Sequence, residues 1–270
     1  MTTVVTPSAE HLDLDARALA PHPRVGRRRF PDGEVFVRVE DVADLDEVLL
    51  VHAGQPHPNR GLAYLHGALS LLADHDCTVR VAFTYVPYCR QDAAFFPGAL
   101  GYARALLRTV TGFDAVDRVY GVDPHFAGRD WVDEFPFETL RAFPLLCAAV
   151  PADDLVVVGP DLGAVERFGV PGFEKERTGT ERVELRGSVD VDGRDVLVFD
   201  DIVSSGETMV AAFERLEEQG AATVRAAAVH GVGEAGVRRV RETYDEFYLT
   251  NAVASEAATV GVEPLLSPLD

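Results

Sequence analysis

Two adjacent carboxylates followed by a short hydroxyl-rich turn form the stretch of this sequence with the most evident chemistry. Asp200 and Asp201 come directly after Val196–Phe199, an apolar run whose β-branched content predicts a strand buried on both faces. The segment Ser204–Thr208 then leads into an amphipathic run, so we expect it to be a strand-to-helix turn. Backbone N–H groups and the helix dipole at such a turn favour a phosphate. A phosphate site beside two carboxylates suits a sugar phosphate.

The structural alternative for this stretch is an ordinary connection in which a serine caps the helix. Capping serines are common, so the Ser-Ser-Gly sequence alone does not distinguish the two interpretations. The adjacent acids Asp200 and Asp201 decide between them, because they repel each other and contribute nothing to packing. They stand where the strand ends, which is where open parallel sheets bind ligands.

The bulk composition predicts two α/β domains. The chain has 270 residues and is 47% hydrophobic, which suits two domains of about 130 residues each. No apolar run reaches membrane-spanning length, and the N-terminus lacks a signal pattern, so we expect a cytoplasmic protein with no membrane partner. The three cysteines are widely spaced and show no metal-ligand pattern, which predicts buried free thiols at Cys77, Cys89 and Cys147.

The charge is strongly acidic and its basic part is almost all arginine. A net charge of −19 argues against nucleic acids and anionic membranes as partners. Lys175 is the only lysine among the 25 basic residues. Adaptation to a salty cytoplasm and a G+C-rich genome would both produce this bias, and the sequence leaves both open.

Hydrophobic periodicity predicts a repeating order of strands and helices. We expect strands over 35–39, 48–53, 79–85, 116–122, 155–159, 196–199, 223–230, 247–250 and 262–266. We expect helices over 61–73, 99–110 and 235–244 and one after the turn at 204–208, with a short one after 163. We expect residues 126–140 to be irregular or to lie at a domain junction, and residues 174–184 to form a mobile loop or hairpin arm.

The two halves of the chain show a short internal similarity. The segments 48–54 and 68–83 align with 196–202 and 212–229, each as strand, turn, helix and strand. This pattern favours tandem related domains, although generic βαβ patterning also produces it. His52 and Ala53 stand where the second copy has its carboxylates, so the first copy is not an equivalent sugar-phosphate site.

Three further polar clusters follow predicted strands. Arg90-Gln91-Asp92 offers a guanidinium suited to a nucleotide phosphate, the alternative being a surface loop. His125 and Asp161 would be able to hold Mg²⁺ together, the alternative for the histidine being a structural role. The third cluster pairs Lys175 with Arg177 on the charged segment, where two cations would stabilise a phosphoryl group during transfer or lie solvated on a loop.

In this order the clusters resemble the ribose-phosphate diphosphokinase family, also called phosphoribosyl pyrophosphate (PRPP) synthetases. The resemblance runs from about Phe30 to Leu266. Its motifs are Phe30-Pro-Asp32-Gly-Glu34, similar to the family's adenine-contacting loop; Pro87-Tyr-Cys-Arg90-Gln91-Asp92; Asp123-Pro-His125; Pro160-Asp161-Leu-Gly163; Lys175-Glu-Arg177; and Asp200–Thr208, which matches the PRPP-binding motif shared with type I phosphoribosyltransferases.

The resemblance implies an α/β fold of two tandem phosphoribosyltransferase-like domains, each a mainly parallel sheet flanked by helices. We expect residues 1–140 to carry the ATP-site elements and residues 141–270 the ribose 5-phosphate site and catalytic loop. The implied reaction is attack of the ribose 5-phosphate 1-hydroxyl on the β-phosphorus of Mg·ATP, which gives PRPP and AMP. It also implies a homo-oligomer in which the loop at Phe30–Glu34 reaches a neighbouring subunit's ATP site.

Residue roles follow from the same resemblance. Lys175 and Arg177 stabilise the transferring group, and His125 and Asp161 bind Mg²⁺. The expected ATP-binding residues are Phe30, Asp32, Glu34, Arg90, Gln91 and Asp92. The expected ribose 5-phosphate-binding residues are Asp200, Asp201, Ser204, Ser205, Gly206 and Thr208.

The sequence departs from the family pattern after Asp92. Family members usually carry basic residues there, whereas this chain has the apolar stretch Ala93–Phe96. Each lost charge-assisted contact to ATP would cost on the order of 1 kcal/mol or more. Two other functions therefore stay open: a non-catalytic homologue that serves as a regulatory or partner subunit, and a phosphoribosyltransferase that uses the same ribose-phosphate site.

Overall fold

The computed structural model of the protein describes residues 1–152, 154–178 and 182–269, with the backbone alone at 175–178 and 182–184. Contacts between Cα atoms divide the chain into two compact units. The first comprises residues 1–141, 252–254 and 262–270, and the second comprises 142–251 and 255–261. The chain therefore returns to the first unit near its end, which nothing in the sequence patterns indicated.

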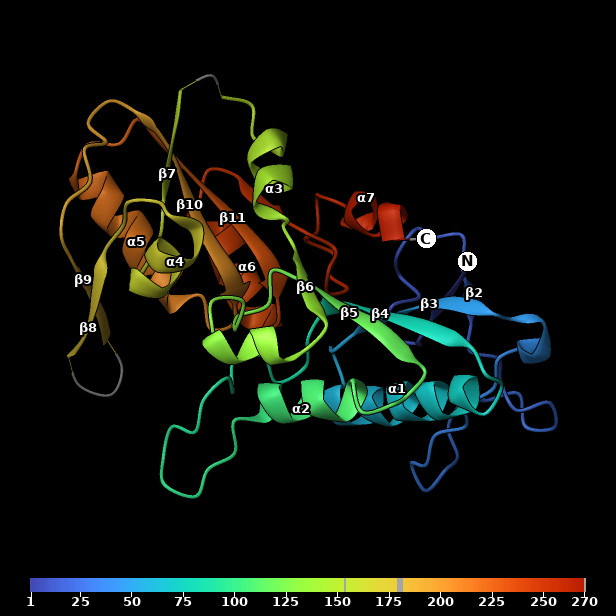
Figure 1. Ribbon diagram of the computed structural model, residues 1–270. Coiled ribbons are helices and arrows are strands. Elements are labelled where there is room, and N and C mark those ends of the chain that lie inside the picture. The colour runs from blue at the N-terminus through green and yellow to red at the C-terminus, as the bar shows by residue number, and fades with distance from the viewer. Residues whose placement is uncertain (153, 179–181, 270) are drawn as a thin grey trace. The chain divides into compact units, whose positions relative to one another are not determined.

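The first unit is built on a six-stranded parallel sheet in the order β2-β1-β3-β4-β5-β6 (Figure 1). The strands are β1 (Thr2–Val5), β2 (Arg17–Ala18), β3 (Glu47–Ala53), β4 (Thr78–Tyr85), β5 (Val116–Val122) and β6 (Phe137–Leu140). The central strands are nearly continuous apolar runs, as expected for strands covered on both faces.

Two helices cover one face of this sheet. Figure 1 shows α1 (Pro58–Ala73) and α2 (Tyr102–Val110) along it. The buried face of α1 repeats at helical spacing through Leu65, Leu69 and Leu72. Shorter helical segments complete the unit: η1 (Val42–Asp44), η2 (Asp130–Glu134), α7 (Glu263–Leu266) and η3 (Ser267–Leu269).

The second unit has a four-stranded parallel sheet in the order β12-β11-β10-β7. Its strands are β7 (Leu155–Val158), β10 (Asp195–Val203), β11 (Thr223–Gly231) and β12 (Phe247–Leu249). Four helices accompany them: α3 (Phe143–Ala149), α4 (Leu162–Phe168), α5 (Glu207–Glu218) and α6 (Glu234–Thr243). The core includes Val196 and Val198 of β10 together with Met209 and Leu216 of α5.

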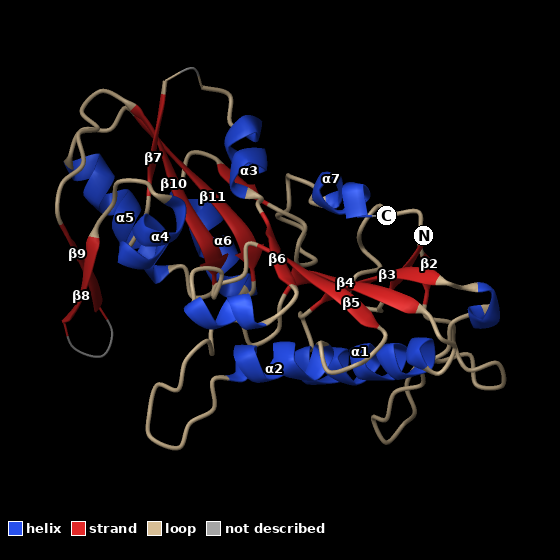
Figure 2. Cartoon of the chain, viewed as in Figure 1, coloured by secondary structure: helices blue, strands red, loops and turns tan. Residues whose placement is uncertain are grey.

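A two-stranded antiparallel hairpin forms the rest of the second unit. It consists of β8 (Glu174–Thr178) and β9 (Arg182–Arg186), and Figure 2 shows it beside α5. The charged segment is thus a hairpin arm, one of the two forms expected for it. The conformation of residues 179–181 at its tip lies outside the described residues.

The predicted α/β class with mainly parallel sheets is confirmed, but two local predictions are wrong and a third is partly right. Residues 35–39 do not form a strand; Val35 makes one antiparallel bridge with Arg29, and the rest is irregular. Residues 262–266 form a helical turn rather than a strand, with Pro264 in its first turn. The segment expected to be irregular or at a domain junction, 126–140, contains η2 and the edge strand β6, and it ends next to the boundary between the two units at 141/142.

Two simpler predictions concern the thiols and the membrane. All three cysteines are free thiols, with Cys77 and Cys89 buried and Cys147 partly exposed. Among the described residues we find no helix with the length and apolar character that a membrane span needs.

Candidate active site

The carboxylate pair and the expected phosphate turn lie together at the carboxyl end of β10. Val196–Phe199 is fully buried, Asp200 is partly exposed and Asp201 is 2% exposed. The turn Ser204–Gly206 connects β10 directly to α5, whose first residue is Glu207. Gly206 has φ 77°, a left-handed conformation that favours glycine. The predicted strand, turn and helix are confirmed, so backbone N–H groups of the turn stand at a helix N-terminus beside two acids.

Helix α6 packs directly against the backbone of this turn. A Cβ atom at Gly233 would lie 2.2 Å from the Ser204 carbonyl oxygen, and one at Gly236 would lie 2.0 Å from it. Real Cβ atoms essentially never approach so closely. Arg239 of the same helix donates from Nη1 to the Ser205 carbonyl at 3.0 Å. The shape of the turn at 204–206 is therefore set by a helix about 30 residues further along the chain.

Tyr244, just past α6, ties that helix to α5. Its hydroxyl donates to the Met209 carbonyl at 2.5 Å, and its ring packs edge-on against Phe213 with centroids 5.1 Å apart. Burial raises the pKa of Tyr244 well above its usual value, with a further contribution from the charge of Asp200. The phenol therefore stays protonated and acts as a hydrogen-bond donor.

The two carboxylates differ in their surroundings. Asp201 forms an ion pair with Arg167 of α4, with Nη1 and Oδ1 2.7 Å apart and both side chains largely buried. Asp200 accepts from the Asp201 backbone N–H at 2.9 Å. Loss of water raises the pKa of Asp200 well above its usual value, and the negative charges of Asp201 and Asp161 add to this. Asp200 is thus the carboxyl with uncompensated charge, and it suits a hydroxyl donor or a cation.

The Arg167–Asp201 pair gives a prediction about stability. In Arg167→Met, the Asp201 carboxylate is left buried without its cation, and removal of one partner of a buried pair costs about 3–5 kcal/mol. We expect the free energy of unfolding in urea to fall by that amount. The matched variant Arg194→Met breaks an exposed pair with Asp154 and should cost about 0–1 kcal/mol. Equal losses in the two variants would contradict the structural role of Arg167.

The two predicted metal ligands lie on different units. Asp161 is the N-cap of α4, where its Oδ1 accepts from the Ala164 N–H at 3.2 Å. His125 is partly exposed and follows β5 after Asp123, which has φ 31°. Within the described residues, no group of three or more His, Cys, Asp or Glu side chains is arranged to hold a metal ion. The pairing of His125 with Asp161 stays a prediction.

Asp161 and Asp200 nevertheless offer a donor set that fits Mg²⁺. Both supply hard carboxylate oxygens, and Mg²⁺ is usually held by one or two carboxylates with waters and substrate oxygens. The pKa of Asp200 is raised first by burial and then by the negative charges of Asp201 and Asp161, and a divalent cation would relieve the repulsion among these charges.

Lys175 and Arg177 lie on β8. The backbone of Lys175 pairs with Leu185 of β9, and that of Arg177 pairs with Val183. Their side chains lie outside the described part of the chain. The role of these two side chains in phosphoryl transfer therefore stays a prediction from the sequence.

In the first unit, Phe30–Glu34 forms a compact turn. The Phe30 N–H donates to the Glu34 carbonyl at 2.8 Å, and the Gly33 N–H donates to the Phe30 carbonyl at 3.0 Å. The Glu34 N–H donates to Asp32 Oδ1 at 3.1 Å. The ring of Phe30 also packs near His22 and Phe36. The turn therefore carries a partly exposed ring followed in the chain by two exposed acids.

Arg90, Gln91 and Asp92 follow β4 and divide into two kinds. Arg90 and Gln91 are exposed, whereas Asp92 is 5% exposed. Asp92 accepts from Arg129 Nε at 2.7 Å, and this hydrogen bond raises the pKa of Arg129. Asp92 is therefore held in an ion pair, and Arg90 and Gln91 are the members open to a ligand. The apolar stretch that follows is also open to solvent, with Phe95 61% exposed and Phe96 74% exposed.

His52 occupies the position in the first unit that corresponds to Asp200. It is fully buried, with Nδ1 2.9 Å from Thr6 Oγ1, and it lies against Gly61 of α1. Burial lowers the pKa of His52 to about 3, so the ring is neutral. The first unit thus has an uncharged packed residue where the second has a carboxylate.

Comparison with known proteins places these features in a family. Residues 164–264 match the phosphoribosyl transferase domain. A ribose-phosphate pyrophosphokinase of Methanopyrus kandleri is 33% identical over 273 residues, covering 95% of this chain and 91% of the relative. The chain belongs to the ribose-phosphate pyrophosphokinase family. A relative with the same name from Halobacterium salinarum is 31% identical over 88% of both chains. The crystal structure of phosphoribosylpyrophosphate synthetase from Mycobacterium smegmatis matches with a TM-score of 0.79 and 25% identity, over 100% of this chain and 97% of that one.

Membership of the ribose-phosphate pyrophosphokinase family confirms the resemblance seen in the sequence, including the expectation of an enzyme. The domain match contains the whole segment from β10 to α6, so the phosphate turn and its supporting helix fall within it.

Sequence reasoning missed the residues that support this pyrophosphokinase site. Four residues, Arg167, Gly236, Arg239 and Tyr244, all act through contacts with residues more than 30 positions away in the chain. The sequence did contain a signal of this close packing, namely two glycines three residues apart, Gly233 and Gly236. A residue without a side chain permits close approach of another backbone.

Proposed function

We propose that this pyrophosphokinase-family chain transfers the diphosphate of Mg·ATP to the 1-hydroxyl of ribose 5-phosphate, giving PRPP and AMP. The proposal rests on one observation, the order of four features along the chain: β10, the carboxylate pair, the turn Ser204–Gly206 and α5. It supplies an anion site and hydroxyl acceptors at adjacent points of one strand-to-helix connection. Relatives named ribose-phosphate pyrophosphokinase that span nearly the whole chain support it.

In this proposal the second unit binds the sugar. The N–H groups and hydroxyls of Ser204, Ser205 and Thr208 bind the 5-phosphate, and Gly206 allows the turn to wrap it. Asp200 accepts from the ribose hydroxyls, directly or through a cation. Because Asp201 is paired with Arg167, we assign it to fixing the end of β10 and to a weaker contact with the sugar.

Mg²⁺ would be held on Asp161 and Asp200 of the second unit and on His125 of the first. When bound, it would neutralise charge on the phosphate oxygens of ATP. Lys175 and Arg177 of β8 stabilise charge that develops on the transferring group, which is where most catalysis of phosphoryl transfer arises. No covalent nucleophile is needed.

The first unit supplies the nucleotide elements. Arg90 and Gln91 are exposed and free to contact ATP phosphates, and Asp92, which directly follows them, is held by Arg129. Phe30, with Asp32 and Glu34, contacts adenine in a neighbouring subunit, so the proposal includes a homo-oligomer. The exposed apolar stretch at 93–96 predicts weaker ATP binding than basic residues would give.

The raised pKa of Asp200 gives a test of the cation site that needs no turnover. In the folded protein this pKa lies above that of the unfolded chain, so Asp200 destabilises the fold increasingly as pH rises from about 3.9 toward the raised pKa. We expect Asp200→Asn to raise the melting temperature at pH 7, by about 2–4 °C per kcal/mol of relief. This difference from wild type should shrink as pH falls toward about 4.

The same pair of proteins tests the cation directly. Mg²⁺ should raise the melting temperature of the wild type and have a smaller effect on Asp200→Asn, because the variant has lost one ligand. If Mg²⁺ raises both melting temperatures equally, Asp200 is not part of the cation site.

Purified protein incubated with Mg·ATP and ribose 5-phosphate, at low and at multimolar salt, tests the proposed reaction. We expect AMP to form only when both substrates are present. Folded protein that binds ribose 5-phosphate but forms no AMP in any condition would support the non-catalytic alternative, which the apolar stretch at 93–96 favours. Release of pyrophosphate from PRPP with a nucleobase, without AMP formation, would instead indicate a phosphoribosyltransferase.

A further inference from the structure

A cavity of about 900 Å³ in the first unit gathers arginines in a strongly acidic chain. Its lining includes Arg27, Arg28 and Arg29 from the loop before the Phe30–Glu34 turn, and Arg60 from the first turn of α1. Two acids, Glu10 and Glu40, also line it. Four guanidinium groups thus face one cavity in a protein whose net charge is −19.

The acids in the lining are already neutralised. Glu10 pairs with Arg28, which donates from Nη2 at 2.9 Å and also from Nη1. Arg28 also donates to the Leu19 carbonyl at 3.1 Å, so this arginine stabilises the lining of the cavity. Glu40 lies 3.3 Å from Arg38, which is outside the lining.

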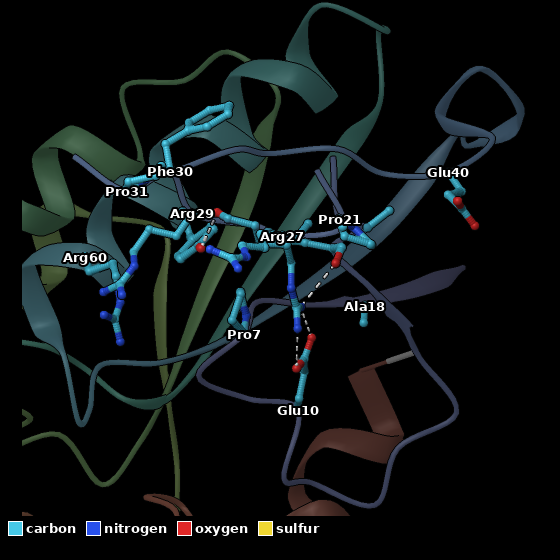
Figure 3. A pocket seen from close by; sticks show the side chains of 15 residues that line it. Pro7, Glu10, Ala18, Pro21, Arg27, Arg29, Phe30, Pro31, Glu40 and Arg60 are labelled. Atoms are coloured by element: carbon cyan, nitrogen blue, oxygen red, sulfur yellow. Dashed lines mark hydrogen bonds and ion pairs between the residues drawn. The ribbon is translucent and has the colours of Figure 1, made fainter. Parts of the chain in front are cut away.

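The other three arginines of the lining are uncompensated. Across residues 1–152, 154–178 and 182–269, we find no side-chain hydrogen bond or ion pair for Arg27, Arg29 or Arg60. Figure 3 shows Arg29 and Arg60 on the same side of the cavity, away from Glu10 and Glu40. Unpaired like charges around one concavity repel each other, and an anion would remove that repulsion.

Tyr64 of α1 holds the arginine loop in place. Its hydroxyl donates to the Arg28 carbonyl at 2.6 Å, which fixes the backbone between Arg27 and Arg29. Burial raises the pKa of Tyr64, while the positive charges of Arg28, Arg60 and Arg29 act in the opposite direction. The Tyr64 hydroxyl is therefore within electrostatic reach of the guanidinium groups of Arg28, Arg29 and Arg60.

We propose that this cavity binds a phosphate-bearing anion between Arg29 and Arg60, with Arg27 contributing from the loop. Planar guanidinium groups donate in pairs to phosphate oxygens, which matches a ligand with two or more negative charges. Pyrophosphate and the phosphate chain of a nucleotide share this chemistry. The inference does not depend on the proposed reaction.

Isothermal titration with pyrophosphate tests the site, using protein saturated with ribose 5-phosphate so that the turn at 204–206 is already occupied. We expect Arg29→Gln/Arg60→Gln to bind pyrophosphate about tenfold or more weakly than wild type, since each lost contact is charge-assisted. The matched variant Arg24→Gln removes an exposed arginine of the same loop that does not line the cavity, and it should bind as wild type does.

Three further measurements complete the design. The double variant should keep wild-type affinity for ribose 5-phosphate, which shows that it is folded, and each single variant should show part of the loss. Equal affinity for ADP and pyrophosphate would assign the site to the free anion, and tighter binding of ADP would assign it to a nucleotide. Equal pyrophosphate affinity in wild type, Arg24→Gln and the double variant would overturn the proposal, and because no turnover is measured, this result is separate from failure of the proposed reaction.

Discussion

Lys175→Ala should lower the rate of AMP formation by about 10³-fold or more while leaving the affinity for ribose 5-phosphate almost unchanged. Phosphoryl transfer depends on charge placed where the transition state develops it, and Lys175 is the only lysine of an acidic chain. The sugar, in contrast, is assigned to the turn at 204–208 on a different element. Steady-state kinetics and titration of ribose 5-phosphate measure the two effects separately.

Arg186→Ala is the matched control for Lys175, because it removes a cation from the other strand of the same hairpin. It should keep most of the activity. If affinity and turnover fell together in Lys175→Ala, the lysine would act in binding and its transition-state role would be wrong. Equal losses of activity in both variants would indicate that catalysis needs a cation on the hairpin but not at a particular position.

Gly236→Ala should weaken ribose 5-phosphate binding about tenfold or more. The new Cβ would stand 2.0 Å from the Ser204 carbonyl oxygen, so α6 and the phosphate turn cannot keep their present positions. Displaced N–H groups lose charge-assisted hydrogen bonds worth about 1.5–3 kcal/mol each. The clash should also lower the free energy of unfolding by about 1–3 kcal/mol, although alanine is otherwise the better helix former.

The neighbouring variant Ala235→Ser is the control, because it adds one atom to an exposed position in the same turn of α6. It should change neither the affinity for ribose 5-phosphate nor the urea unfolding curve by much. Calorimetric titration and urea unfolding of the two variants make the comparison. Wild-type affinity in Gly236→Ala would show that α6 does not shape the turn.

The strand that carries the site was predictable because its signal is local. Val196–Phe199 is apolar without a break, and the acids, turn and helix follow in a fixed order that backbone chemistry explains. Strands β3, β4 and β5 were predicted for the same reason, since each is a buried run bounded by turn residues.

The support of the site was not predictable, because it depends on contacts between distant residues. The approach of Gly236 to Ser204 and the pairing of Arg167 with Asp201 exist only after β10, α4 and α6 have packed. The same limit explains the error at 35–39, where an alternating pattern suits a strand but the backbone finds irregular partners, such as Phe36 N–H with the Arg28 carbonyl. At 262–266 a short, mostly apolar segment interrupted by Glu263 did not distinguish strand from helix, and the structure forms a helical turn.

ATP labelled at its β-phosphorus shows whether the turn after β10 binds the acceptor of a diphosphoryl transfer. With wild-type protein, Mg²⁺ and ribose 5-phosphate, the label should appear in PRPP, and unlabelled AMP should form in equal amount. Asp200→Asn should abolish both products together. Label that stays in ADP while only the γ-phosphate moves, or that stays in ATP although ribose 5-phosphate is bound, would show that the protein does not transfer a diphosphate to this acceptor.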